Sequence, residues 1–158
     1  MDIFQKRALF FLRVVLGWLM FYAGITKIMD PAWSAAGYLE AAKTFPALYQ
    51  WFASPDILPT TNFLNEWGLI LLGVSLIVGI GVRFSGMAGA VLMALYYFPV
   101  LQFPMILPHS YLVDEHIVYA AALLVLAAFR AGRYWGLEKW CAGLPICRRF
   151  PVLREWIG

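Results

Sequence analysis

The chain has 158 residues, of which 63% are hydrophobic and only 13% are charged, and its formal net charge is +3. Soluble domains have about 45–50% apolar and about 25% charged residues, so this chain lacks the polar side chains that would cover a soluble fold. The small positive charge gives no indication of nucleic-acid binding. The composition therefore favours a single-domain protein that lies in a lipid bilayer.

Four long apolar segments indicate membrane-spanning helices. They lie approximately at residues 8–29, 63–82, 84–107 and 112–130. Each has close to the ~20 residues that an α-helix needs to cross ~30 Å of hydrocarbon. The first segment is longer than the core of an ordinary signal peptide and is interrupted by Arg13, so we expect it to remain in the protein. The sequence predicts an all-α fold, an integral membrane four-helix bundle formed by residues 1–158.

The connection 30–62 is too polar to span a membrane and predicts interfacial helices in the first outer loop. Asp30 and Pro31 are typical of the first positions of a helix. The aromatic side chains of this connection suit the lipid headgroup region. Pro46 should divide it into two short helices, and Asn62 is the expected N-cap of the second span.

The distribution of positive charge predicts the orientation. Ten cations fall on one side of the predicted spans: Lys6, Arg7, Arg13, Arg83, Arg130, Arg133, Lys139, Arg148, Arg149 and Arg154. Only Lys27 and Lys43 fall on the other side. Because cytoplasmic loops are enriched in Lys and Arg, we expect a multi-pass protein of the plasma (inner) membrane with both termini in the cytoplasm. The basic, aromatic tail 131–158 would then be cytoplasmic, with Cys141 and Cys147 as free thiols.

The first span carries two cations. Arg13 and Lys27 bracket only 13 uncharged residues, so at least one of them must snorkel to the interface or face a polar interior. Gly17 and Gly24 lie on the same helix face and predict close packing against another helix. Cations at the cytoplasmic ends of the spans are expected to act as anchors: Arg13, Arg83 and Arg130.

Polar and ionisable side chains gather at the outer ends of the predicted spans. They are Lys27 in the first span, Asn65 and Glu66 in the second, and Asp114, Glu115, His116 and Tyr119 in the fourth. In a bundle these groups would share one layer, where charged groups near hydrocarbon must find partners. The candidate catalytic residues are His116, Lys27 and Glu66. The candidate cofactor-binding residues are Tyr119, Asp114 and Asn65.

Plainer structural roles remain open for these residues. Lys27 and Glu66 could form an ordinary ion pair between helices, and Asp114 could simply cap the fourth span. His109, in the loop before that span, is a further candidate for a functional role. Because imidazole changes its charge near neutral pH, His116 is the residue for which a functional role is easiest to argue.

A quinone is the ligand that these side chains suit. The sequence has no G-x-G-x-x-G, Walker or H-E-x-x-H motif, so no nucleotide and no metal cofactor is expected. A quinone ring has two carbonyl oxygens that need donors, and its reduction takes up protons. His116 or Tyr119 could donate to one oxygen and Lys27 to the other, while Glu66 or Asp114 could relay protons. The isoprenoid tail would lie between spans.

Several short motifs carry a resemblance to a known family. They are Arg13-x3-Gly17 and Ala23-Gly24-Ile25-Thr26-Lys27 in the first span, Glu66-x-Gly68, Leu72-Gly73 and Gly79-x-Gly81-x-Arg83 in the second, and Asp114-Glu115-His116-Ile117-Val118-Tyr119 in the fourth. With these motifs the chain resembles the DoxX/DoxD family of small four-helix membrane proteins. The resemblance implies a four-helix bundle with both termini inside. The start of the fourth span is similar to the DoxD branch, the membrane subunit of thiosulfate:quinone oxidoreductase, which works with a second redox subunit.

Three functions remain open from the sequence. The first is an integral membrane subunit of a redox system, a quinone-linked oxidoreductase subunit with its pocket at the outer face. The second is a non-catalytic membrane anchor or assembly partner of a soluble redox enzyme. The third is a small-molecule permease, which would have to be a homo-oligomer because four helices make only a narrow bundle.

Overall fold

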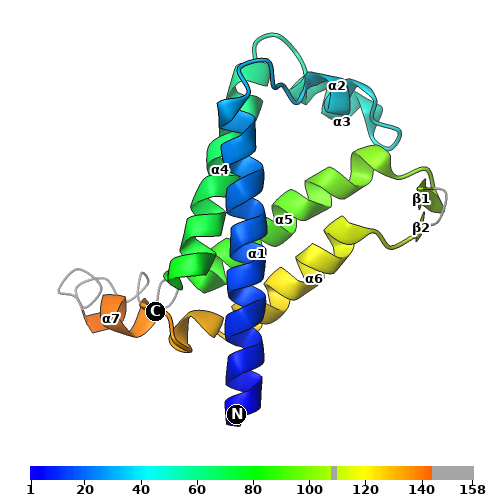
Figure 1. Cartoon of the computed structure of the whole chain (residues 1–158). Coiled ribbons are helices and arrows are strands. Elements are labelled where there is room, and N and C mark those ends of the chain that lie inside the picture. The colour runs from blue at the N-terminus through cyan, green and yellow to red at the C-terminus, as the bar shows by residue number, and fades with distance from the viewer. Residues whose placement is uncertain (108–109, 144–158) are drawn as a thin grey trace.

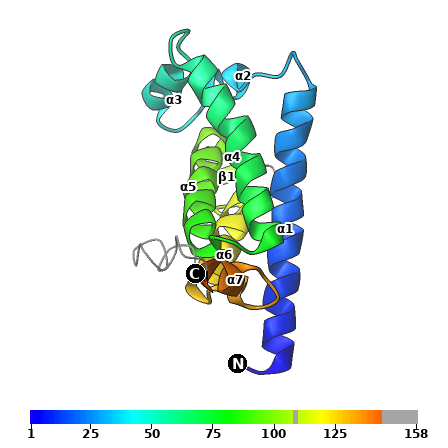
Figure 2. The same ribbon diagram turned by 90° about the vertical axis from the view of Figure 1, so that its left-hand side faces the viewer.

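The computed structural model describes residues 1–107 and 110–143, and this part of the chain is mostly helical (Figure 1). His109, Cys147 and most of the predicted tail lie outside the described residues. The four longest helices form two antiparallel pairs, α1 with α4 and α5 with α6, which diverge toward one end of the molecule (Figures 1 and 2). We call this the Lys27 end, because the C-terminal turn of α1 lies there.

Helix α1 covers Ile3–Met29 and is ~40 Å long. The carboxylate of Asp2 accepts a hydrogen bond from the backbone N–H of Gln5 at 2.7 Å, and the Gln5 side chain accepts one from the Asp2 N–H at 3.0 Å. This capping box satisfies two donors that the first turn would otherwise leave unpaired. At the other end Asp30 has an extended backbone, and its side chain accepts from the N–H of Ala32. Asp30 therefore ends α1. The prediction from the sequence that Asp30 begins a new helix was wrong.

Helix α4, Leu58–Val78, packs along α1 through backbone contacts at glycine. A Cβ atom added at Gly17 would lie 3.0 Å from the carbonyl oxygen of Gly73, and one added at Gly24 would lie 2.8 Å from that of Glu66. Small residues allow such an approach, and the resulting van der Waals contact holds helices together in lipid. The predicted close packing at Gly17 and Gly24 is confirmed.

Helices α5 (Val82–Val100) and α6 (Glu115–Ala128) form the second pair. A Cβ added at Gly86 would lie 2.7 Å from the carbonyl oxygen of Leu123, so glycine brings these backbones together as well. Beyond α6 the chain forms the short helices η1 (Ala131–Arg133) and α7 (Glu138–Gly143).

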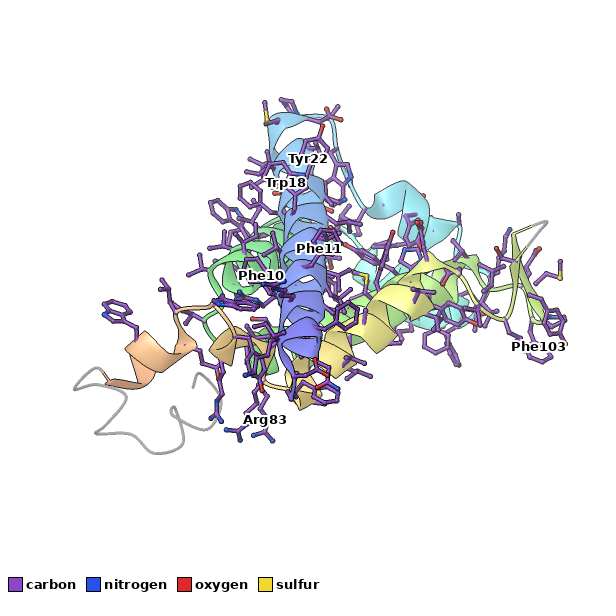
Figure 3. The ribbon with its side chains drawn as sticks, turned by 60° about the horizontal axis from the view of Figure 1, so that its bottom comes forward. Phe10, Phe11, Trp18, Tyr22, Arg83 and Phe103 are labelled. Carbon is purple, nitrogen blue, oxygen red and sulfur yellow. The ribbon has the colours of Figure 1, made fainter. Side chains whose placement is uncertain are left out.

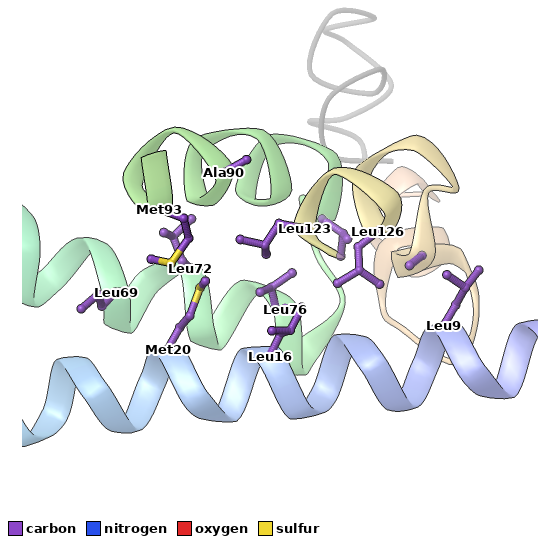
Figure 4. Packing of buried hydrophobic residues seen from close by; sticks show 12 residues of the cluster. Leu9, Leu16, Met20, Leu69, Leu72, Leu76, Ala90, Met93, Leu123 and Leu126 are labelled. Carbon is purple, nitrogen blue, oxygen red and sulfur yellow. The ribbon is translucent and has the colours of Figure 1, made fainter. Parts of the chain in front are cut away.

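Buried apolar side chains join the two helix pairs in one core (Figure 4). All four long helices contribute to it, for example with Met20 of α1, Leu76 of α4, Met93 of α5 and Leu123 of α6. Because interiors of this kind are close-packed, the core fixes the relative positions of the helix ends, which carry the polar side chains discussed below.

The connection between α1 and α4 contains two short helices, α2 (Ala36–Glu40) and α3 (Pro46–Phe52). The prediction that Pro46 separates two helices is confirmed, since it occupies the first turn of α3. The start of α4 differs from the prediction. Asn62 lies inside α4 and its side-chain oxygen accepts from the N–H of Ala35 at 3.0 Å, so its role as an N-cap was wrong.

Helices α2 and α3 are tied to the end of α5 at a proline. Pro99 has no N–H, so the carbonyl of Leu95 loses its partner within the helix. The hydroxyl of Tyr49 donates to this carbonyl at 3.0 Å. The hydroxyl of Tyr38 donates to the neighbouring carbonyl of Tyr96. The connection thus covers the Lys27 end of α5, and Tyr49 supplies the hydrogen bond to the Leu95 carbonyl that α5 cannot make for itself.

A small hairpin corrects two predictions. Strand β1 (Met105–Leu107) pairs antiparallel with β2 (Ser110–Tyr111), so the described fold is not entirely α-helical. The predicted third span, 84–107, was also too long, because α5 ends at Val100. The two prolines Pro99 and Pro104 explain the difference, since neither can continue the helical hydrogen-bond ladder.

Two of the described helices, α1 and α4, are long and apolar enough to cross a membrane. Helix α6 is apolar but has only 14 residues, or ~21 Å, which is less than the hydrocarbon thickness. Large aromatic side chains of α1, including Phe11, Trp18 and Tyr22, project away from the other helices (Figure 3). Length and composition therefore support membrane insertion for the first and second of the four predicted spans.

Candidate functional site

A cavity of about 630 Å³ lies at the Lys27 end, between the two helix pairs and beneath α2. Pockets for small ligands have volumes of about 300–1,000 Å³. The polar side chains in its lining come from α1, α2, α4, α5 and α6 or from segments beside them: Lys27, Ser34, Tyr38, Asn65, Tyr96, Ser110, Asp114, Glu115 and His116. Five of these, Lys27, Asn65, Asp114, Glu115 and His116, were among the polar groups that the sequence placed at the outer ends of the spans, and the fold brings them to one cavity.

Asp114 and His116 form a hydrogen-bonded pair at the start of α6. One carboxylate oxygen of Asp114, Oδ1, accepts from the backbone N–H of Ile117 at 3.1 Å and caps the helix. The other, Oδ2, lies 2.6 Å from Nδ1 of His116. A carboxylate at Nδ1 holds the proton there and leaves Nε2 as an acceptor in the neutral ring and a donor in the charged ring. Asp114 is therefore both the predicted helix cap and the partner of His116.

Two polar atoms of the cavity lining are buried without a hydrogen bond. They are the hydroxyl of Tyr96 on α5 and the side-chain oxygen of Asn65 on α4. The two side chains are close enough to interact, but neither atom has a partner of acceptable hydrogen-bond geometry. A buried polar group without a partner costs about 1–3 kcal/mol, so both atoms are suited to bond a ligand. The Tyr96 ring also meets the His116 ring edge to face, with centroids 5.7 Å apart.

Lys27 enters the cavity from α1 with its charge only partly compensated. Its ammonium group donates to the carbonyl of Ala23 at 3.4 Å and lies 5.2 Å from the centroid of the Trp33 ring, a cation–π contact. Glu66 contributes a favourable charge at longer range. An ammonium with one weak hydrogen bond retains donors for an anionic or carbonyl oxygen.

Tyr38 of α2 forms the roof of the cavity. Burial, with the negative charges of Asp114 and Glu115 acting in the same direction, raises the pKa of Tyr38 to about 12. The phenol is therefore protonated at neutral pH and remains a donor to the carbonyl of Tyr96. Sequence reasoning did not find Tyr38, because its position depends on how the 30–62 connection folds back over α5.

Two predicted site residues lie outside the cavity lining. Glu66 is on α4 but does not line the cavity, and its charge interacts favourably with Lys27. Tyr119 packs against the hydrophobic core, and its hydroxyl donates to Glu115 at 3.4 Å. On α4 and α5 the residues that line the cavity and can contact a ligand directly are therefore Asn65 and Tyr96. In the sequence, Tyr96 stands out only as an aromatic residue of the predicted third span.

A second polar cluster lies at the opposite end of the molecule. Arg13 is completely buried, and its guanidinium donates to the carbonyl of Trp135 at 3.4 Å. It occupies the space above Gly79, where an added Cβ would overlap it. Glu138, also buried, pairs with Arg133 at 3.3 Å and interacts with Arg13. Burial raises the pKa of Glu138, and the neighbouring arginines oppose this rise. Arg13 is thus an interior residue, whereas the sequence had suggested an anchor at the interface.

Within residues 1–107 and 110–143, no three side chains of His, Cys, Asp or Glu lie close enough together to hold a metal ion. The cavity instead offers oxygen and nitrogen groups that can hydrogen bond, beside aromatic rings. Its chemistry suits a flat, polar, uncharged ring that accepts hydrogen bonds and exchanges protons.

The family model of DoxX matches residues 8–102. This match covers α1 from residue 8 onward, the whole 30–62 connection, α4 and α5, and it ends before the hairpin and α6. Neither a curated protein nor a solved structure matches the chain.

Proposed function

Because the chain belongs to the DoxX family of membrane proteins, we propose that it is the multi-pass membrane subunit of a redox system and that it binds a quinone in the cavity at the Lys27 end. The excess of cations on the other side of the spans supports an orientation with both termini in the cytoplasm of the cell and this cavity at the outer face of the inner membrane. In this arrangement α5 and α6 complete a four-helix bundle in the bilayer.

The observation that carries the proposal is the pair of unsatisfied atoms, the Tyr96 hydroxyl and the Asn65 oxygen. A quinone carbonyl can accept from the hydroxyl of Tyr96. After reduction, the quinol hydroxyl can donate to the oxygen of Asn65. One ligand in its two redox states therefore satisfies a donor and an acceptor that the protein leaves unpaired.

The pair of Asp114 and His116 supports the proton chemistry of this reaction. Quinone reduction takes up two electrons and two protons and yields the quinol. His116 in its charged form can donate a proton from Nε2, while the hydrogen bond between its Nδ1 and Asp114 fixes the orientation of the ring. Lys27 can donate to the second ring oxygen as negative charge develops there.

The electrons come from a donor outside this chain. We propose a second redox subunit as that donor, which oxidises a reduced sulfur compound such as thiosulfate, in accordance with the resemblance of the fourth span to the DoxD branch. The described residues 131–143, at the opposite end of the molecule from Lys27, do not line the cavity. The second subunit would therefore approach from the outer face.

Quinone binding to the full chain in lipid nanodiscs tests the proposal. We expect quenching of tryptophan fluorescence by a short-chain benzoquinone, since Trp33 lines the cavity. Tyr96→Phe and His116→Ala should each weaken binding by about tenfold, the effect of one lost hydrogen bond of ~1.4 kcal/mol. Tyr22→Phe, which removes an exposed hydroxyl of α1, is the matched control and should bind as the wild type does.

Two results would contradict the proposal. One is the same affinity for quinone in the wild type, Tyr96→Phe and His116→Ala. The other is the absence of any saturable binding, together with quinone-free protein after mild extraction. The second result would favour a non-catalytic membrane anchor for a soluble redox enzyme.

A further inference from the structure

A second, smaller cavity of about 160 Å³ adjoins the first. The two cavities share four lining residues, Ala35, Tyr38, Asn65 and Tyr96. The rest of the second lining is mostly apolar and lies between α4 and α5, beneath α2 and α3. The two unpaired atoms, on Asn65 and Tyr96, therefore stand at the junction between a polar and an apolar cavity.

The size and chemistry of the second cavity suit a short hydrocarbon group. An apolar protein cavity of ~150 Å³ stays free of water and binds benzene, a six-carbon molecule. The five carbon atoms of one isoprene unit therefore fit a cavity of about 160 Å³. A ligand whose polar ring bonds Tyr96 and Asn65 would direct a ring substituent from the shared wall into this space.

The second cavity also reaches the surface that faces lipid. Leu64 of α4 and Leu95 of α5 both line it, yet they are 62% and 38% exposed. A hydrocarbon chain longer than the cavity can therefore leave between these two side chains without crossing the protein core. On the other side, Tyr49 and Phe52 of α3 close the cavity toward the headgroups.

We infer that the apolar cavity holds the first isoprene unit of a prenylated quinone and that the rest of its tail leaves into lipid between Leu64 and Leu95. This inference rests on the proposed function and makes it more specific, because it selects a membrane-bound prenyl quinone over a water-soluble quinone. The ring and the tail occupy separate cavities, so each can be tested without the other.

Photolabelling of the full chain in nanodiscs tests the tail site. The probe is a benzoquinone that carries a five-carbon chain with a terminal diazirine, and labelled residues are located by mass spectrometry. In the wild type we expect label on Leu64, Leu92 and Leu95, and its loss in the presence of excess quinone without a chain. Leu64→Trp and Leu95→Trp should lose most of this label, because indole fills the exit.

The matched control is Leu71→Trp, two helical turns along the same helix. Leu71 is 64% exposed, as Leu64 is, but it does not line the cavity. Both positions accept a larger side chain without overfilling the core, and equal unfolding transitions of the variants confirm an intact fold. The control should be labelled as the wild type is.

The outcomes separate the tail site from the ring site. Labelling that the chain-free quinone suppresses, but that Leu64→Trp and Leu95→Trp leave unchanged, overturns the tail site and leaves the proposed function standing. Label spread over the exposed face of α1, at Trp18 or Tyr22, also overturns the tail site. If the chain-free quinone still binds, the proposed function stands in this case too. Label that the chain-free quinone does not suppress at all overturns both, because no ring site then directs the tail.

Discussion

Replacement of Gly73 by alanine should separate α1 from α4. A Cβ at Gly73 would lie 2.5 Å from the backbone nitrogen of Phe21, 2.6 Å from its Cβ and 2.7 Å from the carbonyl oxygen of Gly17. These atoms belong to the backbone or are fixed to it, so no side-chain rotation relieves the overlap. The two helices must move apart by roughly 1 Å, because unstrained heavy-atom contacts are about 3.5–4.0 Å.

The magnitude follows from a comparison with a second glycine of α4. At Gly68 an added Cβ would meet no atom within 4 Å. Both substitutions gain the helix propensity of alanine over glycine, about 0.5–1 kcal/mol. Their difference therefore isolates the steric cost, which is about 1–3 kcal/mol for overpacking and should be near 3 kcal/mol against backbone atoms. We expect Gly68→Ala to be slightly more stable than the wild type and Gly73→Ala to be ~2 kcal/mol less stable.

Equilibrium unfolding in mixed micelles, with a rising mole fraction of sodium dodecyl sulfate, measures this difference. Tryptophan fluorescence reports it, since Trp18 and Trp67 lie on the two helices concerned. If Gly73→Ala and Gly68→Ala unfold at the same detergent fraction, α1 and α4 do not pack through Gly17 and Gly73. That result would refute the close backbone contact between α1 and α4 and the steric cost worked out from it.

Three further predictions concern hydrogen bonds and titration. Tyr49→Phe should lower the free energy of unfolding by about 1–3 kcal/mol, because the carbonyl of Leu95 then has no donor. The control Tyr111→Phe, at an exposed tyrosine, should change this free energy by less than about 0.5 kcal/mol. Equal effects of the two variants would contradict a stabilising hydrogen bond from Tyr49 to Leu95. Asp114→Ala should cost about 1 kcal/mol through loss of the α6 cap, whereas Asp114→Asn keeps an oxygen for the N–H of Ile117 and should cost less; the same unfolding measurement distinguishes them. The raised pKa of Glu138 means that the folded state binds its proton more tightly than the unfolded state, so the contribution of Glu138 to stability should be fully present below the usual glutamate pKa and should be lost as the pH rises through the raised pKa. Glu138→Gln should remove this slope, and an unchanged slope in that variant would assign the titration to another group.

The sequence predicted those features that depend on residues close together in the chain, such as glycine spacing and helix caps. Glycine spacing at Gly17 and Gly24 predicted close packing against another helix, which the structure identifies as α4, and the Asp114 side chain before an apolar run predicted a helix cap. Lys27, Asn65, Asp114 and His116 were placed at one end because they stand at the ends of apolar segments, and all four line the cavity. Hydropathy and periodicity are enough for this level of the structure.

What the sequence did not predict depends on contacts between distant segments. Tyr38 reaches Tyr96, 58 positions away, only after the 30–62 connection has folded over α5. Arg13 is buried because η1 and the loop after it return to α1 and bring Trp135 over its guanidinium. Glu66 has the right position along α4, but side chains of adjacent helical residues point about 100° apart, and it is Asn65 that lines the cavity.

The proline in the last turn of α5 affects the site as well as the fold. Pro99 leaves the carbonyl of Leu95 without a helical donor, and Tyr49 and Tyr38 come to this turn of α5 to donate hydrogen bonds. The same turn carries the side chain of Tyr96, whose hydroxyl stays unpaired in the cavity wall. Without Pro99 the carbonyl of Leu95 would also accept from a helical N–H, and the hydroxyl of Tyr49 would have to share this acceptor. Helices α2 and α3 are therefore hydrogen bonded to the last turns of α5, beside the tyrosine that faces the proposed ligand.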